Sequence, residues 1–94
     1  MPVSSVVLRS RAVKLLGNLG KAAQPAAPAL VQTYEYDPDP GVRGLAVICL
    51  KTVDPIGTNT FAVMREAATN SDLMIRDASA YRGKPEDYVY MIKF

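Results

Sequence analysis

The sequence has no histidine and no tryptophan, and its one cysteine is Cys49. Histidine is the commonest general base and the commonest metal ligand, so its absence argues against an enzyme and against a metal site. A lone cysteine excludes an internal disulfide and fits a reducing compartment. We therefore expect a cytoplasmic protein with no catalytic residues, no metal and no cofactor.

Long apolar runs are also missing. No uninterrupted apolar stretch reaches the length of about 18 residues that a membrane-spanning helix needs, and we expect no membrane partner. The hydrophobic fraction of 49% is nevertheless too high for a disordered chain. With 94 residues the chain forms one domain at most.

Acidic residues are absent from the first 34 positions, which hold four basic residues: Arg9, Arg11, Lys14 and Lys21. Residues 35–94 hold seven basic and nine acidic residues. An acid-free, amphipathic start also resembles a mitochondrial transit peptide. The same residues align with residues 39–58 at nearly every apolar position, which favours a first structural repeat instead.

That alignment is part of an internal sequence repeat. Segments 5–12 (SVVLRSRA), 39–46 (DPGVRGLA) and 72–79 (DLMIRDAS) each place a capping-type residue four positions before an arginine and an apolar residue one before it. The three arginines are 34 and 33 residues apart. Self-similarity at this period is typical of stacked helical repeats, whose units bury their apolar faces on one another.

The first helix of each copy is predicted to follow Ser5, Asp39 or Asp72, whose side chains can accept hydrogen bonds from a first helical turn. The spans are about 5–19 and 39–53. Five apolar residues in the first span recur 34 positions later in the second. These pairs, expected to face the core, are Leu8 and Val42, Ala12 and Ala46, Leu15 and Cys49, Leu16 and Leu50, and Leu19 and Val53.

A second helix in each copy is predicted over about 25–36 and 59–69. Its apolar positions are expected at the same offset of 34, which aligns Ala27, Leu30 and Tyr34 with Phe61, Met64 and Ala68. The third copy matches the other two at its start but places Arg82 and Gly83 at positions where they have core residues. We therefore predict a repeat domain over 1–84, with repeats at about 5–37, 38–70 and a partial 71–84. Two interpretations stay open for the tail 85–94: a cap of the stack, or an interrupted third repeat in a truncated gene or an excised fragment. Helix, strand and partner-dependent segment all stay open for its conformation.

Three segments together resemble the HEAT repeat, and more narrowly the HEAT-like type also found in phycobilisome lyase proteins. They are 12–20 (AVKLLGNLG), 26–30 (AAPAL) and 37–43 (DPDPGVR). The resemblance implies an all-α fold of the armadillo-like class: a short right-handed α-solenoid (α-α superhelix) of about two and a half helix pairs, whose second helices line the concave side. It also implies an aspartate–arginine ladder between repeats, formed by Asp39/Arg43 and Asp72/Arg76, with Arg9 matching only the arginine. Since no preceding repeat supplies an aspartate, we expect Arg9 to be the free member.

Two further surfaces are candidate sites. Arg11, Lys14 and Lys21 share one helical face with Asn18, and this basic stripe could attract nucleic acid or an acidic protein patch. The concave surface would expose a mixed polar set that suits protein binding. Its members are Gln32, Glu35, Tyr36, Arg65, Glu66 and Thr69.

We interpret the chain as a non-catalytic protein–protein interaction scaffold. Its partner is another protein or the remainder of a larger parent protein, and unfinished stack ends predict self-association or docking. Two alternatives stay open: a nucleic-acid-binding HEAT domain that uses the basic first helix, and an accessory subunit of a phycobilin-lyase-type enzyme. Cys49 aligns with Leu15 and is predicted to be a buried, unreactive side chain.

Overall fold

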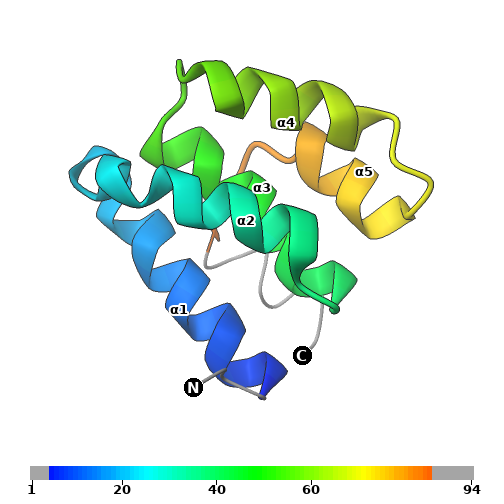
Figure 1. Ribbon diagram of the computed structural model, residues 1–94, viewed down its shortest axis with the longest axis horizontal. Coiled ribbons are helices and arrows are strands. Elements are labelled where there is room, and N and C mark those ends of the chain that lie inside the picture. Colours follow the sequence, from blue (N-terminus) through cyan, green and yellow to red (C-terminus); the bar gives the residue numbers. More distant parts are fainter. Residues whose placement is uncertain (1–4, 86–94) are drawn as a thin grey trace.

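The computed structural model describes residues 5–85, and this part of the chain is all-helical (Figure 1). In chain order, its helices are α1 (Val6–Leu19), the 3-10 helix η1 (Gly20–Ala26), α2 (Ala27–Tyr36), α3 (Pro40–Val53), α4 (Thr58–Ala68) and α5 (Leu73–Ala80).

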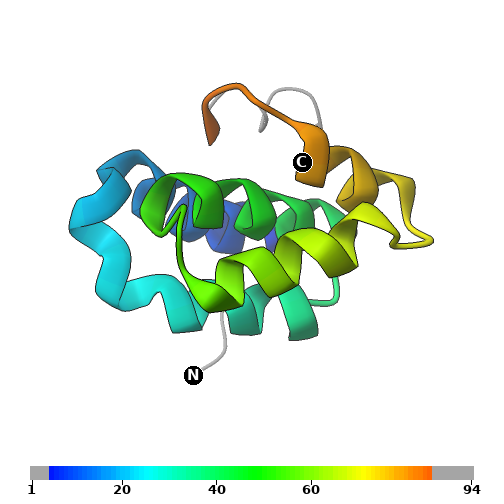
Figure 2. The ribbon, with the colours of Figure 1, turned by 90° about the horizontal axis from the view of Figure 1, so that it is seen from above.

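The helices form two layers. Figure 2 shows α1, α3 and α5 side by side in one layer, with α2 and α4 in the other. The central helix α3 contacts all the other helices, and every residue from Gly41 to Leu50 is buried except Arg43. The core is therefore built around α3, with α1 and α5 at the two edges of their layer.

The predicted helix starts are confirmed. Ser5 Oγ accepts a hydrogen bond from the Leu8 amide (3.4 Å), Asp39 Oδ2 from the Val42 amide (3.0 Å), and Asp72 Oδ1 from an amide of the first turn of α5 (2.9 Å). Each bond satisfies a donor that has no partner within its helix. Gly20 ends α1 with a φ of 58°, a backbone conformation that a side chain would disfavour.

The predicted register of the second helices is wrong by one residue in α4. The counterparts of Ala27, Leu30 and Tyr34 are the buried residues Thr60, Val63 and Ala67, which lie 33 positions further on. Phe61 is 56% exposed as a result. Between the end of the first helix and the first buried residue of the second, the second copy has one residue fewer (54–59 against 20–26), so the offset of 34 that relates α1 to α3 does not carry over.

Of the five residues predicted to form the core face of α1, four are exposed and Leu16 alone packs against the core, half-buried. The side chains of Leu8, Leu15 and Leu19 are 54%, 63% and 60% exposed. The buried residues of α1 are Ser10, Val13 and Gly17, which face α3. The reason is the position of α1 at the edge of its layer, because no described helix packs on its other side. The rest of the predicted tail, 86–94, lies outside the described residues.

Candidate protein-interaction site

The outer face of α1 carries a continuous apolar row, which we call the α1 row: Leu8, Ala12, Leu15 and Leu19. All four are exposed, and their spacing of four, three and four residues places them on one side of the helix. Their counterparts 34 positions later on α3, among them Val42 and Cys49, have no exposed surface, and Val13 and Gly17 of α1 lie against Cys49. One sequence pattern thus occupies two opposite environments.

A groove runs beside the α1 row, between α1 and α2. It has a volume of about 290 Å³, and α1 contributes Arg9, Ala12, Val13 and Leu16 to its lining. The opposite wall is made by Ala29, Leu30, Thr33 and Asp37. The groove is therefore mainly apolar, with an arginine and an aspartate at one end.

Those two residues form an ion pair. Arg9 Nε lies 2.8 Å from Asp37 Oδ2, and Arg9 Nη2 donates to Asp37 Oδ1 at 3.3 Å. Asp37 Oδ1 also accepts a hydrogen bond from the Asp39 amide (2.9 Å), which fixes the carboxylate against the turn into α3. The expectation that Arg9 is the free arginine is wrong.

The predicted aspartate–arginine ladder is not formed between the paired positions. Asp39 and Asp72 use their carboxylates to cap α3 and α5. Arg43 Nε donates to the backbone oxygen of Tyr34 (2.6 Å), and its guanidinium lies 5.5 Å from the centre of the Tyr34 ring. Arg76 is exposed and makes no ion pair with Asp72 within residues 5–85.

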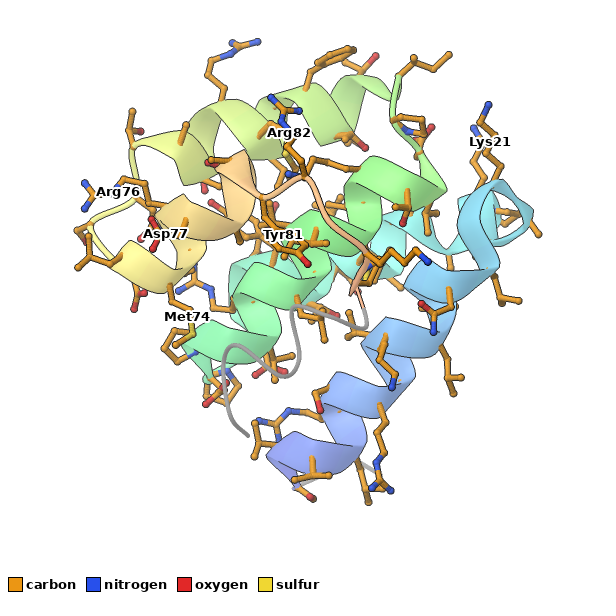
Figure 3. The ribbon with its side chains drawn as sticks, turned by 180° about the vertical axis from the view of Figure 1, so that it is seen from behind. Lys21, Met74, Arg76, Asp77, Tyr81 and Arg82 are labelled. Atoms are coloured by element: carbon orange, nitrogen blue, oxygen red, sulfur yellow. The ribbon has the colours of Figure 1, made fainter. Side chains whose placement is uncertain are left out.

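The predicted basic stripe is only partly one helical face. Arg11 is exposed and Lys14 half-buried on α1, whereas Lys21 lies beyond the helix end, in η1. Figure 3 shows Lys21 at one end of the molecule and Arg76 on α5 at the other. Among residues 5–85, no acidic side chain pairs with Arg11, Lys14 or Lys21.

The predicted concave surface lies on α2 and α4, which share one layer (Figure 2). Gln32, Glu35, Arg65 and Thr69 are exposed, and Tyr36 is 77% exposed.

Glu66 belongs to the same predicted surface but has a structural contact. Its Oε1 accepts a hydrogen bond from the Tyr34 hydroxyl (2.8 Å) and so joins α2 to α4. Burial, followed by this bond, raises the pKa of Tyr34 to about 12.

Cys49 is a buried core residue, as predicted. Its thiol has no exposed surface and lies 3.4 Å from the Val13 carbonyl oxygen. Burial raises the pKa of this thiol to about 12, so the reactive thiolate is not formed at neutral pH. Residues 5–85 contain no group of three side chains suited to hold a metal ion. No helix in that range is both long and apolar enough to cross a bilayer.

Lys51 is a structural residue that the sequence analysis did not identify. Its Nζ donates to the carbonyl oxygens of Ala78 (3.1 Å), Ser79 (3.0 Å) and Tyr81 at the end of α5. A lysine suits this position because the last carbonyls of a helix lack partners and carry partial negative charge. Burial, with a smaller effect of Arg82, lowers the pKa of Lys51 to about 8.

No family model matches this chain, and no curated protein or solved structure matches it either.

Proposed function

We propose that this chain is a non-catalytic protein-interaction module, built as a short right-handed α-solenoid of HEAT-like helix pairs. The two-layer arrangement and the capping residues that recur at the starts of α1, α3 and α5 support the repeat architecture. Each helix pair would bury its apolar face on the next pair, and the pairs at the ends of the stack would keep unfilled faces.

The observation that carries the proposal is the α1 row. Three leucines that are more than half exposed lie in one line beside an apolar groove. Scattered apolar side chains are normal on a protein surface, but a contiguous apolar patch is typical of an interaction site. The same positions on α3 are fully covered by helix packing, which supports a polypeptide as the natural ligand.

Site-specific photo-crosslinking in the native cell tests this function. A benzoylphenylalanine at Leu15 reports on the α1 row, and one at Tyr36 reports on the predicted concave surface. Ile56, which is 83% exposed in the turn before α4, serves as an apolar control position away from both. We expect a discrete protein adduct at Leu15 or Tyr36 and none at Ile56. If neither surface gives an adduct that the control lacks, the proposed function is wrong.

A second candidate function is nucleic-acid binding, and the observation that favours it is the set of cations on α1 and η1 without acidic partners among residues 5–85. Phosphate contacts by these side chains would make the affinity fall steeply with salt. Charge reversal at Arg11 and Lys14 is expected to abolish retention on heparin or RNA if this function is correct. Unchanged retention would exclude it.

A further inference from the structure

We infer that the α1 row and the neighbouring groove together dock an amphipathic α-helix of a partner protein, and that this helix carries acidic residues beside its apolar row. The inference rests on the proposed function, because it specifies the partner of a protein-interaction module.

The fold already contains a helix packed beside this sequence pattern. On α3, the residues equivalent to the α1 row are buried, and α1, a helix of 14 residues, packs against the side that carries Cys49. That helix presents small side chains at the contact, since Gly17 is close enough to Cys49 that an added Cβ would lie 2.4 Å from the sulfur. By analogy, a partner helix of similar length would cover the α1 row.

The groove favours a helix over a membrane surface as the binding partner of this face. A flat bilayer surface could touch the leucines of the α1 row, but it would leave the groove of about 290 Å³ between α1 and α2 unfilled. Side chains projecting from a helix fill such grooves, which is the ordinary way in which helices pack. Arg9 and Asp37 close one end of the groove and already satisfy each other.

The charge of α1 indicates which residues flank the apolar row of the partner helix. Arg11 and Lys14 lie on the side of α1 next to the row, and no acidic residue occurs anywhere in the first 34 positions. Because Asp37 already pairs with Arg9, the remaining positive charge of this face belongs to Arg11 and Lys14. Acidic side chains on the incoming helix would neutralise it and speed its association.

A second copy of this chain fits the face poorly. Two α1 helices packed antiparallel about a twofold axis would bring Arg11 and Lys14 of both copies together, and like charges repel. The opposite end of the molecule offers α5, which has 8 residues against the 14 of α1. Its outer side places Asp77 between the exposed residues Leu73 and Ala80, so it could cover only part of the α1 row.

The test uses two stapled helical peptides as probes, because a short free peptide is marginally helical in water. Each has 14 residues, the length of α1, with leucine or alanine at the spacing of the α1 row. One carries glutamates beside this row and its twin carries lysines. Fluorescence anisotropy of the labelled peptides with the full chain gives both affinities. We expect the acidic peptide to bind at least about tenfold more tightly than its twin, a difference of about 1.4 kcal/mol.

Two variants and a control make the result specific. Leu15→Glu should weaken binding of the acidic peptide at least about tenfold, whereas Ile56→Glu, at a still more exposed apolar position elsewhere, should leave it unchanged. The double variant Arg11→Glu/Lys14→Glu should reverse the preference between the two peptides. Equal affinity for both peptides, or an affinity unaffected by Leu15→Glu, would overturn the inference.

The rival occupants have their own measurements. Binding to phosphatidylserine vesicles that depends on Leu15, or a dimer mass in light scattering that Leu15→Glu reduces to a monomer, would overturn the helix inference in favour of a membrane or a second copy. A crosslinked protein at Tyr36 would keep the proposed function intact even if the acidic peptide failed to bind. The two conclusions can therefore fail separately.

Discussion

Helices α1 and α3 carry the same spacing of apolar residues but have different neighbours. The α1 row is exposed, while its counterparts on α3 have no exposed surface. In α3 the apolar spacing correctly indicates a buried side that packs against other helices, whereas the same spacing in α1 lies on an exposed side. Whether that contact is made depends on the neighbour, and α1 lies at the edge of its layer (Figure 1). A repeated pattern thus identifies surfaces of similar composition, and the structure shows which of them a described helix covers.

The largest contrast is expected between buried and exposed leucines. Leu45 on α3 has no exposed surface, so Leu45→Ala should lower the free energy of unfolding by about 2–5 kcal/mol. The same change at Leu15, which is 63% exposed, should cost less than about 0.5 kcal/mol. Urea denaturation followed by circular dichroism measures both. Similar losses for the two variants would contradict the assignment of α1 to the edge.

The contact between the two helices can be disturbed from the α1 side. A Cβ added at Gly17 would lie 2.4 Å from Cys49 Sγ and 3.1 Å from Pro85 Cγ. Gly17→Ala should therefore destabilise the chain by about 1–3 kcal/mol, although alanine is otherwise the better helix former. In a Cys49→Ala background most of this penalty should vanish, because the sulfur is removed. A double-mutant cycle measures the coupling, and additive effects would show that the two residues do not touch.

The other edge of the layer can be tested through pH. Because the pKa of Lys51 is lowered to about 8 in the folded chain, the folded state binds fewer protons than the unfolded state between pH 8 and the ordinary lysine pKa. Stability should therefore rise with pH from about 8 to 10, by on the order of 1 kcal/mol for this half-buried group. Above pH 10 the raised pKa of Tyr34 acts in the opposite direction.

The matched variant for this effect is Lys51→Met, which keeps the length of the side chain and removes the charge. Its urea midpoint should lack the rise between pH 8 and 10. If wild type and variant show the same pH dependence, Lys51 is not its source.

Local rules predicted much of the secondary structure. The capping residues Ser5, Asp39 and Asp72 correctly indicated the starts of α1, α3 and α5, because capping depends on side chain and backbone within one turn. The end of α1 at Gly20 followed from the same local chemistry. The burial of Cys49 was predicted from its repeat position, and the helix that covers this position is present in the fold.

The errors all depended on longer-range information. The register of α4 was predicted wrongly because the second copy has one residue fewer before the first buried residue of its second helix, Thr60. A fixed offset of 34 cannot reveal such a difference. The predicted ladder is absent at Asp39 and Asp72 because aspartate is also a good capping residue. Both carboxylates accept hydrogen bonds from amides in the first turns of their own helices. Lys51 was missed because its carbonyl partners lie about 30 residues away, on α5 and the segment after it.

The smallest expected effect is the most informative about the α1 row. Leu15→Glu replaces an apolar side chain by a charged one, a change that is severe wherever the side chain is buried. At a position that is 63% exposed, it should change the free energy of unfolding by less than about 0.5 kcal/mol, since glutamate is a good helix former and Arg11 lies one turn away. The measurement is again the urea midpoint, with Leu45→Glu as the buried control that should not fold. A loss of more than about 1 kcal/mol at Leu15 would mean that the row is covered in the folded chain, and no partner helix could then dock there.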